Sequence, residues 1–242
     1  MYDIELNQDL LKLVENKRIA LIGPAPYLAG KNEGGYIDDY DVIIRPNQFH
    51  IPEKLKKNYG SRTDIMFHNF ATPHMAGIED LIKTYPEDFS KLKMMGCLTI
   101  RSDRGQDILS LPNNYISDVV RNFDKINKYN IPFYWIGVPD YKKIYNELDS
   151  EPYTGILSIA ILLKYPIKEL FLSGYTFYLE ANTPDELYFD GYQTERYKNK
   201  FMPGHGGDAN RKSIEFFKKL VEEHKDIIKI DDKISNLLGI VK

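Results

Sequence analysis

Cysteine is almost absent from this sequence of 242 residues, which holds only Cys97. A single cysteine excludes an intramolecular disulfide, so nothing in the sequence demands an oxidising compartment. Long apolar runs are absent too: the longest, residues 156–163, is far short of the roughly 20 residues that a membrane-spanning helix needs. An excess of one charge is also missing. The formal net charge of -3 gives no general attraction to nucleic acid or to acidic membranes.

Residues 1–16 contain no basic stretch that leads into an apolar run, so they do not have the pattern of a signal peptide. Hydrophobic residues make up 43% of the chain and charged residues 28%, the balance of an ordinary globular protein. We therefore expect a cytoplasmic protein that forms one domain over residues 1–242, with no nucleic-acid partner. The sequence leaves the oligomeric state open.

Short apolar runs alternate with helix-like stretches along the chain. The runs that predict strands are residues 18–23, 41–45, 63–68, 96–101, 131–137, 169–173 and 226–230. Helical patterns lie between several of them, at residues 116–129, 153–164 and 209–224. Nearly continuous apolar strands that alternate with helices are typical of a parallel sheet covered on both faces. The sequence therefore predicts an α/β fold: a single Rossmann-like domain with a mostly parallel sheet.

One segment, residues 179–207, is polar and rich in Tyr, Asp and Gly. Loops of this length within a compact domain are usually functional, so we interpret it as a candidate lid over a binding site. The alternative is a disordered insertion. Four aromatic residues argue against that alternative, because disordered segments are poor in aromatic side chains. They are Tyr188, Phe189, Tyr192 and Phe201.

Gly23 ends the first predicted strand, at the edge of the sheet where open α/β folds bind their ligands. A glycine at this turn lets a ligand approach the backbone closely. The segment does not match the G-x-G-x-x-G dinucleotide motif, because Pro24 and Pro26 lack the N–H groups that would hold a phosphate. The second predicted strand ends in Arg45 rather than in an acidic residue that grips an NAD ribose. These features disfavour a Rossmann oxidoreductase.

Residues 34–47 (GGYIDDYDVIIRPN) resemble the large sialylmotif of glycosyltransferase family 29, roughly G-x-x-I-D-x-x-D-x-V-x-R-x-N. The spacing is kept without a gap, and Ile43 replaces the valine. The resemblance implies a nucleotide-activated sugar donor. The amide of Asn47 offers such a nucleotide both a hydrogen-bond donor and an acceptor.

The charged residues of this motif have several interpretations. Arg45 would pair with Asp38 or Asp41 and so fix the loop. Alternatively, the carboxylates only cap a helix or a turn. A third interpretation, a metal bound by Asp39 and Asp41 in a D-x-D pair, is disfavoured because the families that this chain resembles work without a metal.

The second half of the chain is similar to glycosyltransferase family 42, the bacterial lipooligosaccharide sialyltransferases. An apolar helix is predicted to open at Thr154 and Gly155, and residues 152–155 (PYTG) also resemble the small sialylmotif P-S-[ST]-G. A helix N-terminus presents free N–H groups and the positive end of a dipole. It would suit the phosphate of CMP or the carboxylate of a sialic acid, with the Thr154 hydroxyl as a further donor. A role of Thr154 as N-cap is compatible with this one.

The resemblance to family 42 implies further site residues. Tyr178, after the sixth predicted strand, and Tyr188, in the candidate lid, look like the two tyrosines that hold the departing phosphate. Phenols stabilise such a growing charge by hydrogen bonding without a metal. Taken alone, each tyrosine would be interpreted as a packing residue. Asn69 resembles a donor-binding asparagine, whereas the neighbouring His68 has no counterpart and would either face the site or pack against the sheet.

His205 resembles the histidine that acts as the general base in family 42, because it too precedes a polar turn and an amphipathic helix. The acceptor hydroxyl must lose a proton as it attacks the anomeric carbon. Imidazole, with an ordinary pKa of about 6.5, takes that proton at neutral pH. Gly204 and Gly206 permit close approach of a substrate. The alternative is an idle, exposed side chain, which is the interpretation that we give to His224.

Four departures from the two families stand out. Pro24 and Glu151 stand where a nucleotide-contacting Asn and an Arg are usual, and the single cysteine excludes the disulfide of family 29. Ala209 replaces the glutamate of the family 29 motif H-x-x-x-E. These departures affect the expected donor sugar, the acceptor and the activity itself more than the fold.

The sequence thus predicts an inverting glycosyltransferase of the sialyltransferase type with a GT-A variant fold. It would move sialic acid, or a related 2-keto sugar acid, from a CMP-activated donor to a hydroxyl of a glycan or glycolipid. The predicted site consists of Gly23, Asn47, Asn69, Thr154, Gly155, Tyr178, Tyr188 and His205. We expect no metal and no cofactor, and a glycolipid acceptor would bring the protein to a membrane surface. The alternative is a catalytically inactive CMP- or nucleotide-binding module of the same fold.

Overall fold

A computed structural model describes residues 4–70, 72–100, 107–113, 115, 118–179, 188–192 and 208–240. Seven strands form one sheet in the order β5-β4-β3-β2-β1-β6-β7, and all neighbouring pairs are parallel. The strands are β1 (Arg18–Ile22), β2 (Val42–Pro46), β3 (Ile65–Phe67), β4 (Met94–Cys97), β5 (Phe133–Trp135), β6 (Glu169–Ser173) and β7 (Ile228–Ile230).

The strand order reverses beside β1. The chain places β2 to β5 outward on one side of β1 and then returns to place β6 on the other side. At such a switch point, loops that leave adjacent strands diverge and open a crevice outside the carboxyl ends of the strands. In this sheet the switch point lies between β1 and β6.

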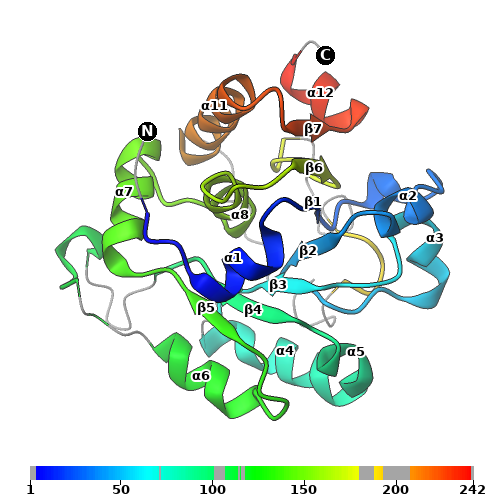
Figure 1. Cartoon of the computed structure of the whole chain (residues 1–242), viewed down its shortest axis with the longest axis horizontal. Coiled ribbons are helices and arrows are strands. Elements are labelled where there is room, and N and C mark those ends of the chain that lie inside the picture. Colours follow the sequence, from blue (N-terminus) through cyan, green and yellow to red (C-terminus); the bar gives the residue numbers. More distant parts are fainter. Residues whose placement is uncertain are drawn as a thin grey trace.

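Helices cover both faces of the sheet (Figure 1). One face carries α1 (Gln8–Val14), α7 (Val138–Leu148), α8 (Thr154–Leu162), α11 (Asp208–Glu223) and α12 (Asp232–Leu238), which share one apolar cluster. On the other face, α2 (Gly34–Asp38) and α3 (Lys56–Tyr59) pack over β1 and β2. There α4 (Thr72–Thr84), α5 (Pro86–Ser90) and α6 (Asp118–Ile126) pack over β3 to β5. Short 3-10 turns occupy Pro26–Leu28, Glu53–Leu55 and Ile108–Ser110.

The first strand shows why these runs form strands. Ile19 and Leu21 belong to the cluster under α8, whereas Ala20 and Ile22 belong to the cluster under α2. Successive side chains of a strand point to opposite faces, so a strand covered on both sides must be apolar at every position. This requirement explains the continuous apolar run that marks β1 in the sequence.

The helix α8 lies in the core, between the sheet and the helices α7 and α11 (Figure 1). Its residues from Ile156 to Leu162 are all buried. A helix that is apolar all round is stable only when it is covered on every side. Burial of α8 fixes its N-terminus, at Thr154, near the carboxyl edge of the sheet.

The predicted α/β fold with a parallel sheet is confirmed, and each of the seven predicted strands forms. The fourth strand is shifted: it covers Met94–Cys97 rather than residues 96–101, because Met94 and Met95 pair with Ile65 and Met66 of β3. The three predicted helices correspond to α6, α8 and α11. None of the helices in the described ranges has the length and apolar character needed to cross a membrane. The single domain over residues 1–242 stays a prediction.

Candidate functional site

Several residues at the carboxyl edge of the sheet have a left-handed backbone conformation, with positive φ. Three aromatic residues in the described ranges have positive φ, and all three follow strands: Phe70 (45°) after β3, and Phe177 (51°) and Tyr178 (59°) after β6. Asn47 (60°) follows β2. A left-handed L-residue costs roughly 1–2 kcal/mol, so it persists only where the surroundings enforce it. Such strain is concentrated at functional sites, and here it lies at the edge that contains the switch point.

Gly23 and Gly174 bring the ends of β1 and β6 into direct contact. A Cβ atom on either glycine would overlap the carbonyl oxygen of the other. Gly23 N–H donates to the Ser173 carbonyl at 2.8 Å, and Ala25 N–H donates to the Gly174 carbonyl at 3.0 Å. The close approach that Gly23 permits in this structure is therefore to another backbone segment. The role of Gly23 in donor binding stays a prediction.

Asn47 is held at the end of β2. Its backbone N–H donates to the Phe67 carbonyl of β3 at 2.6 Å. Its side chain forms a hydrogen bond with the phenol of Tyr192. Tyr192 is only 5% exposed, and its hydroxyl also donates to the Pro46 carbonyl at 3.3 Å. The predicted donor-binding amide thus lies beside a tyrosine from the candidate lid.

Tyr178 and Tyr188 lie side by side, and their hydroxyls share a hydrogen bond. The Tyr188 ring stacks on Tyr192 with centroids 4.7 Å apart, and the Tyr153 ring lies 5.2 Å from Tyr178. Burial raises the pKa of both Tyr178 and Tyr188, and the shared hydrogen bond adds to this for Tyr178. Both phenols are therefore protonated at neutral pH, when they can donate to an anion.

Residues 188–192 are packed onto the ends of β1 and β2. The N–H of Phe189 donates to the Pro24 carbonyl at 2.9 Å, and its ring, 4% exposed, lies 4.9 Å from that of Tyr59. On the surface, Asp190 pairs with Lys54 at 2.6 Å. This part of the candidate lid therefore lies over the ends of β1 and β2, and its role as a lid stays a prediction. The rest of the lid segment, 180–187 and 193–207, lies outside the described residues.

The N-terminus of α8 reaches the same place. Tyr153 occupies the N-cap position and makes no side-chain cap hydrogen bond, so Thr154 is the first helical residue rather than the cap. The first N–H groups of the helix have no partner within the helix. A Cβ atom on Gly155 would stand 2.8 Å from the ring of Tyr175, so glycine is required for this contact.

Arg45, at the end of β2, is close enough to Tyr175 for its charge to act on that phenol. Arg45 is 2% exposed and donates to the Thr63 hydroxyl at 3.1 Å and to the carbonyls of Tyr59 and Arg62. Burial lowers the pKa of Arg45 to about 10, although nearby carboxylates oppose the shift. Burial raises the pKa of Tyr175, and the charge of Arg45 opposes that shift.

The predicted pairing of Arg45 with an aspartate of its motif is replaced by the backbone contacts above. Asp38 accepts from the Ser61 N–H at 2.9 Å, and Asp41 accepts from the Arg18 N–H at 2.8 Å. Both carboxylates thus fix loops. In the described part of the chain, no three His, Cys, Asp or Glu side chains gather as a metal site requires.

Asn69 and His68 lie one strand further along, after β3. His68 is 2% exposed, and its Nδ1 accepts the N–H of Phe70 at 2.9 Å. Asn69 is half-buried, and its carbonyl accepts from the Cys97 thiol at 3.4 Å. His68 therefore packs into the sheet edge and shapes the turn. Asn69 lies on the correct edge, next to the strand that carries Asn47, and its role stays a prediction.

His205, the predicted base, lies outside the described residues, and its role also stays a prediction. The chain is described again from Asp208, where α11 begins. Elsewhere, His50 pairs with Asp88 at 2.7 Å and stacks on Tyr85 at 3.4 Å between ring centroids, so it is a packing residue.

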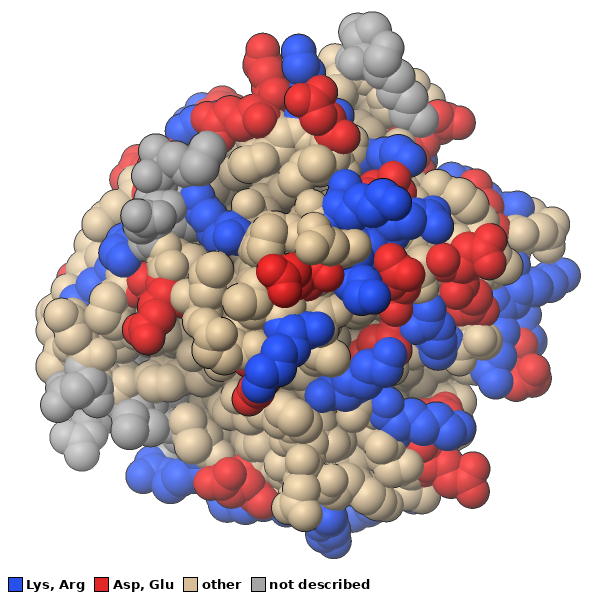
Figure 2. All heavy atoms as spheres, in the orientation of Figure 1, with Lys and Arg blue, Asp and Glu red and all other residues tan. Residues whose placement is uncertain are grey.

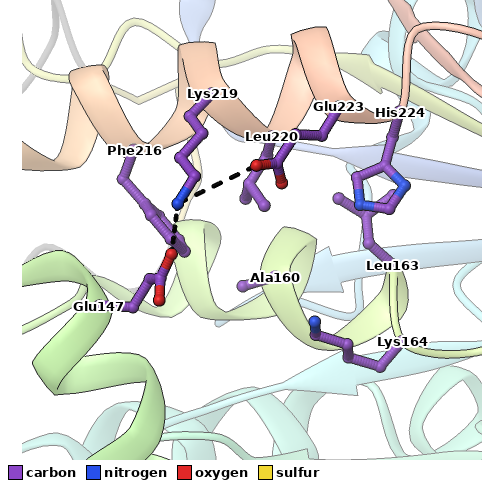
Figure 3. Close-up of a pocket in the computed structure, with 9 residues that line it drawn as sticks. All are labelled: Glu147, Ala160, Leu163, Lys164, Phe216, Lys219, Leu220, Glu223 and His224. Atoms are coloured by element: carbon purple, nitrogen blue, oxygen red, sulfur yellow. Dashed lines mark hydrogen bonds and ion pairs between the residues drawn. The ribbon is translucent and has the colours of Figure 1, made fainter. Parts of the chain in front are cut away.

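A small cavity of about 10 Å³ lies between α7, α8 and α11 (Figure 3). It has room for about one water molecule. Lys219 of α11 pairs with Glu147 of α7 and with Glu223 one turn along its own helix. Lys164 in its wall lies just beyond the C-terminus of α8, the end opposite to Thr154. This cavity is therefore unrelated to the predicted site.

A larger cleft of about 620 Å³ lies over β6 and β7. Its apolar lining includes Tyr36, Phe171, Ile228 and Ile230, and its basic lining includes Lys31, Lys225 and Lys229. Lys229 is paired with Glu169 at 2.5 Å. None of the described residues that line the cleft is a predicted site residue. Positive and negative side chains are interspersed over the face shown in Figure 2, without a broad surface of one sign.

Three tyrosines of the site were missed by sequence reasoning: Tyr153, Tyr175 and Tyr192. Tyr153 directly precedes the helix start, and Tyr175 follows the glycine at the end of β6. Their positions beside predicted site residues were a usable signal. The abundance of tyrosine, with 18 in the chain, hid that signal.

Comparison with known proteins gives a match by structure and not by sequence. No protein-family model matches the chain, and no curated protein sequence matches it significantly. The fold is similar to that of a mammalian sialyltransferase solved in complex with Gal-beta-1-3GalNAc-ortho-nitrophenol. That match has a TM-score of 0.52 and 17% identity, and covers 94% of this chain and 74% of the other.

Bacterial structures are similar as well. The sialyltransferase CstII from Campylobacter jejuni, in complex with the substrate analogue CMP-3FNeuAc, matches with a TM-score of 0.54 and 17% identity over 88% of this chain and 81% of its own. A variant of CST-II in complex with CMP matches with a TM-score of 0.53 and 19% identity, over 91% and 85% of the two chains. The structural neighbours are thus sialyltransferases, and this chain shares their fold.

Proposed function

We propose that this protein is an inverting glycosyltransferase that moves sialic acid, or a related 2-keto sugar acid, from a CMP-activated donor to a glycan hydroxyl. One observation carries the proposal. Segments far apart in the sequence bring Asn47, the start of α8, Tyr178 and Tyr188 to the topological switch point. Neighbours of the same fold include one solved with CMP and one solved with a CMP-sugar analogue.

The chemistry of the site suits departure of a phosphate. As the bond between the sugar and CMP breaks, negative charge grows on the phosphate oxygens. Tyr178 and Tyr188 donate to those oxygens with protons that burial holds in place, because burial raises the pKa of both phenols. The N-terminus of α8 adds free N–H groups and the positive end of its dipole. These groups act without a metal.

The acceptor side of the reaction is assigned to His205. Its imidazole takes the proton of the acceptor hydroxyl during an in-line attack that inverts the anomeric centre. Asn47, Asn69, Thr154 and Gly155 would hold the donor. A glycolipid acceptor would place the reaction at a membrane surface.

Thermal-shift measurements test the nucleotide class. CMP and CTP should raise the melting temperature of the protein, because a ligand that binds only the folded state stabilises it. NAD(P) should leave the melting temperature unchanged. Stabilisation by NAD(P) and not by CMP would overturn the proposal in favour of an oxidoreductase.

The variant His205→Ala separates an enzyme from an inactive CMP-binding module. We expect the variant to keep CMP binding and to lose transfer from CMP-sialic acid to a galactoside acceptor. His224→Ala is the matched control, because His224 follows the C-terminus of α11 and lines the small cavity, whose described lining contains no predicted site residue. CMP binding without transfer by the unmodified protein, over a panel of acceptors, would support the inactive module instead.

A further inference from the structure

The hydroxyl of Tyr175 is a buried polar group that the fold leaves unsatisfied. It has no hydrogen-bond partner among the described residues. A buried hydroxyl without a partner costs roughly 1–3 kcal/mol, and such groups are rare in native proteins. The other phenols around it are engaged: Tyr178 and Tyr188 with each other, and Tyr192 with Asn47.

The ring of Tyr175 is fixed between two backbone segments. A Cβ atom on Gly155 would stand 2.8 Å from its Cε1 atom, and one on Gly23 would stand 3.2 Å from its Cδ2 atom. Both glycines are predicted donor-site residues. The start of α8 and the loop after β1 therefore hold the ring from two sides, and its hydroxyl has little freedom to find another partner.

The surroundings of the hydroxyl are suited to an anion. The charge of Arg45 is close enough to act on Tyr175, and Tyr175 in turn acts on Tyr178 and Tyr192. Burial raises the pKa of Tyr175, so its hydroxyl keeps its proton at neutral pH and offers a hydrogen bond. A fixed donor with a buried cation nearby is complementary to an oxygen that carries negative charge.

We propose that Tyr175 is a donor-recognition residue whose hydroxyl donates a hydrogen bond to an anionic oxygen of the bound CMP-sugar. The proposal rests on the proposed function and adds a residue to its site. A CMP-sugar of this class carries two such sources, the phosphate of the nucleotide and the carboxylate of the sugar acid. The hydroxyl is not accessible to solvent in the structure, so the packing around it must shift to admit either one.

The test compares the affinities of the unmodified protein and Tyr175→Phe, by calorimetry, for cytidine, CMP and CMP-3FNeuAc. Loss of a hydrogen bond to a charged oxygen should weaken binding by on the order of tenfold. If the partner is the phosphate, the variant binds CMP and CMP-3FNeuAc more weakly and cytidine equally well. If it is the carboxylate, only CMP-3FNeuAc binding weakens. Equal affinities of both proteins for all three ligands would overturn the proposal.

The melting temperature of the empty protein provides a second readout. Tyr175→Phe should not lower the melting temperature, because the removed hydroxyl makes no hydrogen bond with the described residues. A lower value would show that the hydroxyl has a partner within the protein, and would also overturn the proposal. Tyr134→Phe is the matched control: this phenol of β5 is buried and bonded to Tyr165, so its loss should lower stability and leave CMP affinity unchanged.

Failure of this inference is distinguishable from failure of the proposed function. If the unmodified protein binds CMP and the variant binds it equally well, with equal affinity for CMP-3FNeuAc, only the role of Tyr175 fails. If the unmodified protein binds neither CMP nor CMP-3FNeuAc, the proposed function fails and the role of Tyr175 fails with it.

Discussion

At the scale of single residues, the two phenols at the proposed phosphate site are held by burial and by their mutual hydrogen bond. Tyr178 adopts a left-handed backbone directly after Phe177, which does the same. Two consecutive bulky residues in this region are costly, so the surrounding packing must compensate for them. The hydrogen bond between Tyr178 and Tyr188 keeps both hydroxyls together in the structure. A phosphate that enters would replace this hydrogen bond with one from each phenol.

Tyr178→Phe removes one of these donors and keeps the ring that packs against Tyr153. We expect the transfer rate to fall about a hundredfold, the usual effect of removing one donor from a site that stabilises developing charge. Initial rates with CMP-sialic acid measure the effect. Tyr129→Phe is the control, because Tyr129 is 46% exposed and packs on Phe89, away from the site. Equal rates for the two variants would remove Tyr178 from the mechanism.

Gly23→Ala should destabilise the protein by roughly 1–3 kcal/mol or more, since the new methyl group overlaps the Gly174 carbonyl. Urea unfolding measures the loss. Gly35→Ala is the matched control: a Cβ atom there meets nothing within 4 Å, and alanine favours the helix α2 in which it lies. The control should be neutral or slightly stabilising. A stable Gly23→Ala protein would contradict the contact between the ends of β1 and β6.

Residue positions were predictable from the sequence where a motif placed them. Asn47, Tyr178 and Tyr188 were found this way, and the structure brings them to one edge. The pairing of Arg45 with Asp38 or Asp41 was predicted wrongly, because its partners are the Thr63 hydroxyl and backbone carbonyls 14 and 17 residues further along. A pattern of side chains in the sequence does not reveal which backbone carbonyls will accept hydrogen bonds.

At the scale of elements, Asp231 joins three segments behind the site. Its carboxylate is 7% exposed and accepts from the hydroxyls of Tyr27 and Ser173 at 2.7 and 2.6 Å. It also caps α12 by accepting from the Ile234 N–H at 2.8 Å. The hydroxyl of Tyr27 in turn accepts the Gly174 N–H at 2.8 Å. This network positions the loops after β1 and β6, which form the crevice.

Asp231→Asn keeps the shape of the side chain but exchanges an acceptor for an amide donor. The groups around Asp231 donate hydrogen bonds, so the NH2 group of the new amide would face other donors. We expect the variant to lose about 3 kcal/mol of unfolding free energy. Asp232→Asn, one residue further along at an exposed position in the first turn of α12, should change it by less than about 1 kcal/mol. Denaturant unfolding measures the free energy of unfolding of both variants. Similar values for the two would show that the network contributes little to stability.

Elements were predictable where burial dictates composition. The strands are apolar throughout because helices cover both faces, and α8 is apolar all round because it lies in the core. The segment 188–192 was not predictable in the same way. Its contacts with Pro24 and Pro46 join residues more than a hundred positions apart, and a local pattern does not encode such a contact.

At the scale of the whole molecule, many tyrosines are buried with their protons. Burial raises the pKa of Tyr27, Tyr178 and Tyr192 above the ordinary value of about 10. An unfolded chain releases these protons near that ordinary value, whereas the folded protein keeps them. The contribution of these groups to stability is therefore intact below about pH 10 and is lost as the pH rises toward their folded pKa values.

These tyrosines should therefore leave the melting temperature unchanged from about pH 7 to pH 9. Above about pH 10 they should make it fall steeply. The absorbance of tyrosinate should reach its full value, that of all 18 tyrosines, only when the protein unfolds, because exposed tyrosines such as Tyr129 contribute before that point. The full absorbance in protein that is still folded would show that the buried phenols are accessible to water.

The overall architecture was largely predictable from the sequence. Alternation of apolar runs and helices predicted a parallel sheet, and the order of the strands then placed a crevice at β1 and β6. The convergence of Tyr153, Tyr175 and Tyr192 was not predictable, because it depends on how three separate segments pack. Similarity to sialyltransferase structures at 17% to 19% identity shows the same division: the fold is kept while most residues differ.

A crystal structure of the protein soaked with CMP tests the central claim most directly. The account predicts CMP at the carboxyl ends of β1, β2 and β6, with phosphate oxygens within hydrogen-bonding distance of the Tyr178 and Tyr188 hydroxyls and the two phenols no longer bonded to each other. CMP bound elsewhere, for instance in the cleft over β6 and β7, would contradict it.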